Sequence, residues 1–231
     1  MKRIAMALVA LAVAAPLSAQ AGAMDADPTT EVAGSGGLPD GWMVRFDPVR
    51  VRPNRPTPPT PTVADVNFRV MGSGLHATSG PAGVYYKSGD EAMGEYTVSV
   101  RFSQAKSMGH EGYGIVFGGS NLQESTQNYV YFIVRPNDGA FLINHRSSDA
   151  APTKLVGWET HEAVTAEDAD GKASNALSVR VTNDAVHFVA NGEEVSVLSR
   201  VELGDASSDG QIGLRINHNL DLHIAEFAIT H

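Results

Sequence analysis

The 231-residue sequence contains no cysteine. A disulfide framework, a thiol nucleophile and a lipid-anchored cysteine are therefore excluded. The fold has to be stabilised by its own apolar core.

Basic residues are scarce: 17 Lys and Arg stand against 26 Asp and Glu, and the formal net charge is −9. A chain this acidic, without basic clusters, repels phosphate backbones, so we expect no nucleic-acid partner. After residue 23 no apolar run reaches the roughly 18 residues of a membrane-spanning helix, so we expect no membrane span after the N-terminal segment.

Local signatures of catalysis and metal binding are also missing. There is no Gly-x-Ser-x-Gly nucleophile elbow, and none of the eight histidines has a His-Glu-x-x-His spacing. The sequence therefore predicts no metal and no cofactor, identifies no catalytic residue, and indicates no oligomeric state.

The N-terminus has the pattern of a secretory signal peptide. Lys2 and Arg3 precede an apolar run from Ile4 to Ala15, and small residues up to Ala23 offer cleavage sites. We predict a signal peptide over residues 1–23 and a periplasmic or extracellular location.

Residues 24–62 are predicted to form a flexible acidic and proline-rich segment, followed by a β-sandwich domain over residues 63–231. Five prolines between Pro53 and Pro61 exclude a helix or a central strand. Two alternatives stay open for this segment: a stiff spacer, or a strap across the domain anchored by Trp42. Trp42 to Phe46 itself is interpreted as a short strand or an edge segment.

The rest of the chain is typical of antiparallel strands. Tyr96 to Phe102 and Leu177 to Val181 alternate apolar and polar residues, which predicts half-buried strands. Asn191-Gly192 between two such runs predicts a tight hairpin. In the last strand the apolar residues change parity, which predicts a bulge near Ala225-Glu226.

About a dozen strands and no convincing long helix predict an all-β fold, an antiparallel two-sheet jelly-roll sandwich. A closed barrel is the alternative.

The order of these motifs resembles the concanavalin A-like lectin/glucanase jelly rolls. The resemblance covers roughly Phe68 to Ile229, and it is carried by the runs Gly94–Phe102, Gly112–Gly119, Asn128–Arg135, Asp209–Ile216 and Ile224–Ile229. The branch that it most resembles is the bacterial exported domains grouped with 3-keto-disaccharide hydrolases. Retaining glucanases of this fold carry Glu-x-Asp-x-x-Glu on one strand, and this sequence lacks that motif.

A sugar site needs aromatic rings to stack on sugar faces and planar polar groups to bind hydroxyls. The residues of suitable type in the central region are Tyr113, Tyr131, Arg135, Asn144, Arg146 and Trp158. Strand parity places Asn144 and Arg146 on one face. The same aromatic residues are also ordinary core or rim residues of a sandwich.

Three hypotheses about function remain open at this point. The first is an exported, lectin-like carbohydrate-binding sandwich with a glycan or glycoside as its partner. The second is a hydrolase of a modified (3-keto) glycoside, as the resemblance implies, and the third is a structural or protein-interaction module.

Overall fold

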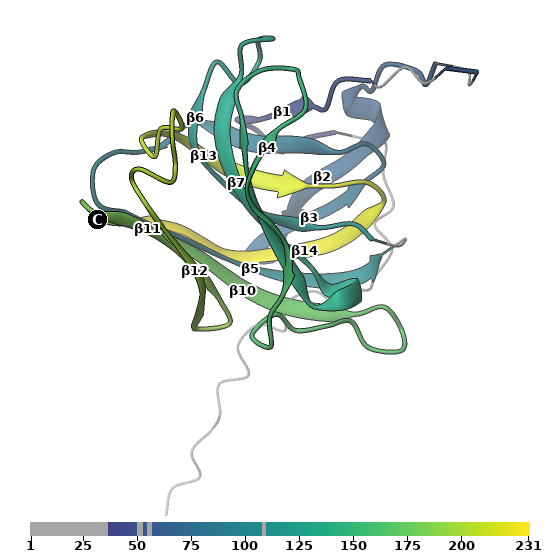
Figure 1. Cartoon of the computed structure of the whole chain (residues 1–231). Coiled ribbons are helices and arrows are strands. Elements are labelled where there is room, and N and C mark those ends of the chain that lie inside the picture. The colour runs from purple at the N-terminus through teal and green to yellow at the C-terminus, as the bar shows by residue number, and fades with distance from the viewer. Residues whose placement is uncertain (1–36, 50–52, 55–56, 108–109) are drawn as a thin grey trace, which may run out of the picture.

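The computed structural model describes residues 37–49, 53–54, 57–107 and 110–231 and contains two antiparallel sheets of seven strands each (Figure 1). Each sheet runs from one edge strand to another, so the predicted two-sheet sandwich is confirmed and the barrel is not formed. The predicted signal peptide lies outside the described residues. No helix within the described ranges is both long and apolar enough to cross a membrane.

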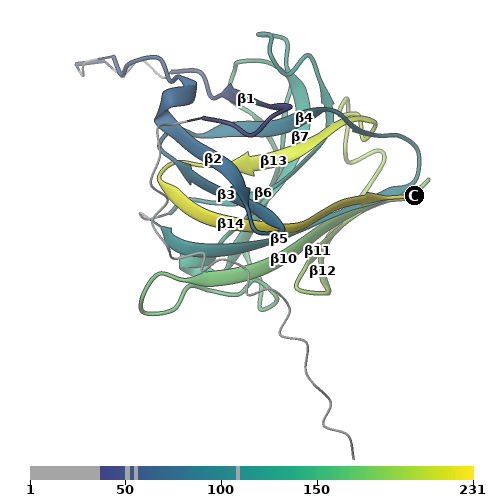
Figure 2. The ribbon, with the colours of Figure 1, turned by 180° about the vertical axis from the view of Figure 1, so that it is seen from behind.

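We call the two layers sheet I and sheet II. Sheet I has the order β1 (Trp42–Phe46), β4 (Gly83–Ala92), β13 (Gly210–Ile216), β6 (Tyr113–Ser120), β7 (Asn128–Arg135), β8 (Ala140–Arg146) and β9 (Thr153–Thr160). Sheet II has the order β12 (Glu193–Ser199), β11 (Ala185–Ala190), β10 (Ala173–Val181), β5 (Tyr96–Ser107), β14 (Leu220–Thr230), β3 (Gly74–Ser79) and β2 (Val66–Met71). Figure 2 shows β2, β3, β14, β5 and β10 following one another across sheet II. The described ranges also contain two short 3₁₀ turns, η1 (Val63–Asp65) and η2 (Pro136–Asp138).

The core lies between the sheets and follows the alternation of the strands. Tyr96, Val98, Val100 and Phe102 of β5 point inward and are at most 3% exposed. From sheet I, the Phe132 ring of β7 meets the Phe188 ring of β11, with ring centroids 5.4 Å apart. Buried apolar side chains of both layers thus form one continuous core, as the period-two patterns predicted.

The last strand contains the predicted bulge. Leu222 and Ile224 are buried, the register with β5 shifts between Ala225 and Ala228, and Glu226 adopts a positive φ of 56°. The shift turns Phe227 inward, where it packs against the core. The bulge therefore lets both halves of β14 bury their apolar residues.

The sandwich uses residues that precede position 63. β1 pairs along β4, and Trp42 is 9% exposed, with its ring centroid 4.8 Å from that of Phe68. Gly37 forms a parallel bridge with Asn67. Within the described part of the proline-rich segment, Pro58, Pro59 and Pro61 line a pocket together with the loop between β3 and β4.

Candidate functional site

Three of the predicted site residues meet on the outer face of sheet I. Tyr131 on β7 lies opposite Asn144 on β8, and the Asn144 amide donates a hydrogen bond of 2.7 Å to the Tyr131 hydroxyl. Arg146 lies opposite Tyr129, two residues along each strand. All four side chains belong to residues that are at most 6% exposed.

Two further charged residues, Asp47 and Arg215, complete this group, and no local sequence pattern marks them. Arg215 on β13 donates to both carboxylate oxygens of Asp47, at 2.7 and 2.6 Å, and its guanidinium carbon lies 5.5 Å from the Tyr131 ring centroid. Arg146 Nη2 lies 3.8 Å from the same carboxylate. We call Asp47, Arg146 and Arg215 the charged triad.

The triad changes the ionisation of its members. Burial alone would raise the pKa of Asp47, but the Arg215 charge and hydrogen bonds, together with the Arg146 charge, lower this pKa to about 2. Burial would lower the pKa of Arg215, and the nearby Asp47 carboxylate raises it instead. The carboxylate and the guanidinium are therefore both ionised throughout the neutral pH range.

Three buried polar atoms in or next to the triad have no hydrogen-bond partner among the residues that the structure describes. They are the Arg146 Nε, the Tyr129 hydroxyl and the Asn144 Oδ1. Most buried polar atoms in proteins are paired with protein atoms or with ordered water, so three unpaired atoms on neighbouring strands require an explanation.

A second polar network joins two loops to β1 on this face. Arg45 Nη2 donates to both carboxylate oxygens of Asp149, at 2.8 and 3.0 Å, and Gln127 Nε2 donates to Asp149 Oδ1 at 2.5 Å. Gln123 donates to the Tyr86 hydroxyl at 2.8 Å. These contacts hold the β6–β7 and β8–β9 loops against β1.

A pocket of about 1010 Å³ opens beside the triad, and we call it the proline pocket. Asp47 and Arg215 lie on its wall, and the remaining lining residues are Pro48, Val49, Pro58, Pro59, Pro61, Asp65, Gly80, Pro81, Ala82, Glu111, Asn217 and His218. His218 Nδ1 lies 3.5 Å from a Glu111 oxygen. Chiefly through its hydrogen bond, Glu111 raises the pKa of His218 above its ordinary value.

The other predicted site residues lie elsewhere. Tyr113 points into the core, is fully buried, and accepts a hydrogen bond of 3.4 Å from Asn175. Arg135 stacks on Trp158, with its guanidinium carbon 3.9 Å from the ring centroid, and is paired with Asp138. The structure therefore distributes the six predicted residues over three places and brings Tyr131, Asn144 and Arg146 together.

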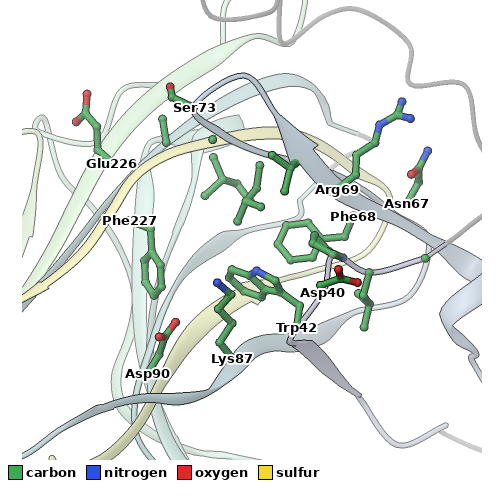
Figure 3. Close-up of a pocket in the computed structure, with 18 residues that line it drawn as sticks. Asp40, Trp42, Asn67, Phe68, Arg69, Ser73, Lys87, Asp90, Glu226 and Phe227 are labelled. Atoms are coloured by element: carbon green, nitrogen blue, oxygen red, sulfur yellow. The ribbon is translucent and has the colours of Figure 1, made fainter.

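A separate groove of about 900 Å³ lies at the open edge of the sandwich, between β1 and β4 of sheet I and β2, β3 and β14 of sheet II. We call it the edge groove. Figure 3 shows the rings of Trp42, Phe68 and Phe227 in it, with Lys87 and Asp90 on one side and Asn67 and Arg69 on the other. Lys87 Nζ lies 6.0 Å from the Trp42 ring centroid, and the Phe227 ring lies 6.3 Å from that of Trp42.

Within the described ranges, no group of three or more His, Asp or Glu side chains is arranged to hold a metal ion. The polar residues at both concavities are suited to hydrogen bonding and ion pairing.

Known structures share this architecture, although no known protein-family profile and no curated protein sequence matches the chain. The carbohydrate-binding module CBM66 from Bacillus subtilis aligns with a TM-score of 0.56 and 11% identity, over 84% of this chain and 99% of the module. A Bacillus subtilis protein of unknown function with a galectin-like fold aligns with a TM-score of 0.52 and 12% identity, over 82% of this chain and 88% of that protein. At these identities the likeness shows the fold alone, an antiparallel two-sheet jelly-roll sandwich, as the sequence predicted.

Proposed function

We propose that this protein binds carbohydrate and that the sugar lies in the edge groove. The observation that carries the proposal is the combination of aromatic rings and polar side chains around one open groove of about 900 Å³ (Figure 3). This volume is in the range of small-molecule sites, which are largely apolar with a few well-placed polar groups. The likeness to a carbohydrate-binding module supports the proposal at the level of the fold.

The chemistry of the groove suits a neutral sugar. The partly buried Phe227 ring lines the groove together with Trp42, which is 9% exposed, and both rings offer apolar contact to the carbon-bound hydrogens of a pyranose ring. Charged side chains of both signs line the groove, so it carries no strong excess of one charge: Asp40, Asp90 and Glu226 are acidic, and Arg69 and Lys87 are basic. An oligosaccharide with many hydroxyl groups and no charge fits these surroundings best.

The test is calorimetric titration with a panel of neutral oligosaccharides. Phe227→Ala and Lys87→Ala are expected to weaken binding at least tenfold. Trp158→Ala is the matched control, because Trp158 is the second tryptophan of the chain and stacks on Arg135 instead. Loss of binding in Trp158→Ala alone would assign the sugar to the sheet I residues that the sequence predicted. If wild type binds none of the sugars, the proposal is overturned.

Tryptophan fluorescence gives an independent readout of the position of the sugar. In Trp158→Phe, Trp42 is the only tryptophan left, so a sugar in the edge groove is expected to change the emission of this variant. Sugar that binds, as judged by calorimetry, without changing this emission would place the site elsewhere.

We further propose that residues 1–23 direct export and are removed. Mass spectrometry of the mature protein recovered from the periplasm or medium is expected to show a chain that begins near Met24. A mature chain that retains Lys2 and Arg3 would contradict this proposal.

Hydrolysis of a modified glycoside is the second candidate, and one observation favours it. Glu111 and His218 form an acid–base pair on the wall of the proline pocket, beside Asp47. Incubation with 3-keto-glycosides is expected to release product in the wild type and at least 100-fold less in Glu111→Gln. Absence of product from the wild type would remove this candidate.

A further inference from the structure

We propose that Arg146 and Arg215 form a binding site for a carboxylated sugar, and that Asp47 of the same chain occupies this site in the present structure. The site lies on sheet I and is separate from the edge groove. It therefore goes beyond the neutral-sugar site proposed above and does not depend on it.

The first argument is the geometry of Asp47. Its two carboxylate oxygens accept parallel hydrogen bonds from Arg215 at 2.7 and 2.6 Å, and Arg146 approaches one of them to 3.8 Å. Paired hydrogen bonds of this kind are the usual way in which arginine recognises a carboxylate ligand. Asp47 thus holds the position that a ligand carboxylate would take.

The second argument is the balance of charge. The side chains of Arg146 and Arg215 are 5% and 6% exposed, and Asp47 is the one carboxylate in ion-pair contact with them among the described residues. The nearby Asp149 carboxylate accepts hydrogen bonds from Arg45 at 2.8 and 3.0 Å. Two buried cations therefore share one directly paired anion, although the whole chain carries a net charge of −9. Arg146 Nη1 also donates to the Ala150 carbonyl oxygen at 2.9 Å, which satisfies this donor without neutralising the charge. Buried charges that lack a full partner are costly, which favours the binding of a further anionic group.

The third argument comes from the unpaired atoms beside the triad. Arg146 Nε is a donor, Asn144 Oδ1 is an acceptor, and the Tyr129 hydroxyl can act as either. The strand register places these residues next to one another on one face. A simple carboxylate supplies acceptors alone and leaves an acceptor such as Asn144 Oδ1 unsatisfied, whereas a carboxylate with a neighbouring hydroxyl group also supplies a donor. This set of atoms therefore points to a sugar acid.

The fourth argument is access. The Asp47 side chain is 28% exposed, several times more than either arginine, and it lines the proline pocket of about 1010 Å³. It follows the last residue of β1 and is held there by one backbone hydrogen bond to Ala82. Rotation of this side chain into the pocket would release the two guanidinium groups to an incoming carboxylate. No covalent bond is made or broken in the exchange.

The experiment compares glucuronate with glucose by calorimetric titration of the full chain at constant ionic strength. Wild type is expected to bind glucuronate in the millimolar range and to bind it at least tenfold more tightly than glucose or acetate. Asp47→Asn removes the competing charge and is expected to tighten glucuronate binding at least tenfold. Asp149→Asn is the matched control. It removes a carboxylate on the same face, one that contacts Arg45, and the glucuronate affinity of this variant should equal that of wild type.

Tyr129→Phe keeps the proposal testable if Asp47→Asn fails to fold. It removes an unpaired buried hydroxyl, so its melting temperature is expected to stay the same or rise, while glucuronate affinity falls at least fivefold. A purely structural role of Tyr129 would leave the affinity unchanged.

The proposal is overturned if wild type does not bind glucuronate, if acetate binds as tightly as glucuronate, or if Asp149→Asn gives the same gain as Asp47→Asn. None of these outcomes bears on the edge groove, because the titration that tests the groove uses neutral sugars and Phe227→Ala.

Discussion

At the scale of single residues, Asp47 is the carboxylate that pairs with both Arg146 and Arg215 on sheet I. The folded protein lowers the pKa of Asp47 to about 2, below its unfolded value of about 3.9. A carboxyl group shifted in this direction stabilises the fold above the unfolded pKa, and this stabilisation is lost as the pH falls from about 4 to about 2.

We therefore expect Asp47→Asn to lower the free energy of unfolding at pH 7 by up to about 3 kcal/mol, because two buried guanidinium groups lose their anion. The difference between wild type and variant should shrink as the pH falls from 4 to 2. Urea unfolding at several pH values measures both effects. Asp184→Asn, at an exposed position, is the control and should stay within about 0.5 kcal/mol of wild type. A pH-independent difference would show that Asp47 does not titrate as the structure requires.

The sequence predicted part of this site and missed the rest for a clear physical reason. Strand parity placed Asn144 and Arg146 on one face, and they do lie together. The partner of Arg215 is Asp47, which is 168 residues away in the chain. A contact over this distance depends on the order of strands in the sheet, and no local pattern in a single sequence reveals that order.

His218 gives the second prediction at this scale. Glu111 raises its pKa, mainly through their hydrogen bond, while burial and the Arg215 charge oppose the shift and the Asp47 charge adds to it. In Glu111→Gln, the pKa of His218 is therefore expected to fall to its ordinary value of about 6.5 or lower.

A raised pKa stabilises the fold below pH 6.5, and this contribution is lost as the pH rises through the folded pKa of His218. The free energy of unfolding of wild type should therefore be larger than that of Glu111→Gln at pH 6, and the difference should be smaller at pH 9. NMR titration of the His218 ring measures the pKa directly. Glu194→Gln is the control, because it removes a carboxylate next to His187 and should leave the pKa of His218 unchanged. If the pKa of His218 in Glu111→Gln equals that of wild type, the proposed contact between Glu111 and His218 is wrong.

At the scale of elements, one irregular residue of β14, Glu226, lets the apolar side chains before and after it point into the same core. Glu226 has a φ of 56°, where a side chain with a Cβ atom is strained, and its carboxylate contacts Arg101 at 3.2 Å at an exposed position. Exposed ion pairs of this kind contribute little to stability, so the backbone strain should dominate.

Glu226→Gly is expected to be more stable than Glu226→Ala by about 1 kcal/mol, because glycine adopts a positive φ without strain. Both variants lack the ion pair with Arg101, so their difference isolates the backbone effect. Denaturant unfolding at pH 7 measures it. Equal stabilities would mean that the bulge is not strained at Glu226.

Elements that a short sequence pattern marks were predicted correctly. The Asn191-Gly192 turn joins β11 to β12, and both residues have positive φ values, 51° and 88°, as the primed hairpin turns require. The bulge of β14 was visible as a change in apolar parity. In contrast, β4 pairs with β13 and β5 with β14, and these neighbours are separated by more than 100 residues.

At the scale of the whole molecule, the two sheets share one core without disulfides, and residues on both sides of the proline-rich segment contribute to it. Trp42 of β1 packs against Phe68 of β2 and Phe227 of β14, so the first strand of sheet I contacts sheet II along the edge groove. Asp47 fixes the chain that follows β1 to β13. The folded unit therefore depends on the stretch before residue 63.

A chain that begins at Val63 is therefore expected to be far less stable than a chain that begins at Gly37. It loses the burial of Trp42, about 2 to 3 kcal/mol, and leaves Arg146 and Arg215 without Asp47, up to about 3 kcal/mol more. Together these losses approach the total stability of a typical domain, about 5 to 15 kcal/mol.

Thermal unfolding followed by near-ultraviolet circular dichroism compares the two chains directly. The chain from Gly37 should give a cooperative transition, and the chain from Val63 a melting temperature at least about 10 °C lower or no transition. Equal melting temperatures would show that β1 and Asp47 are dispensable and that the sandwich begins at residue 63. The same truncation removes Trp42 from the edge groove, so undiminished binding of neutral sugars by a folded shorter chain would contradict the contact between Trp42 and the sugar.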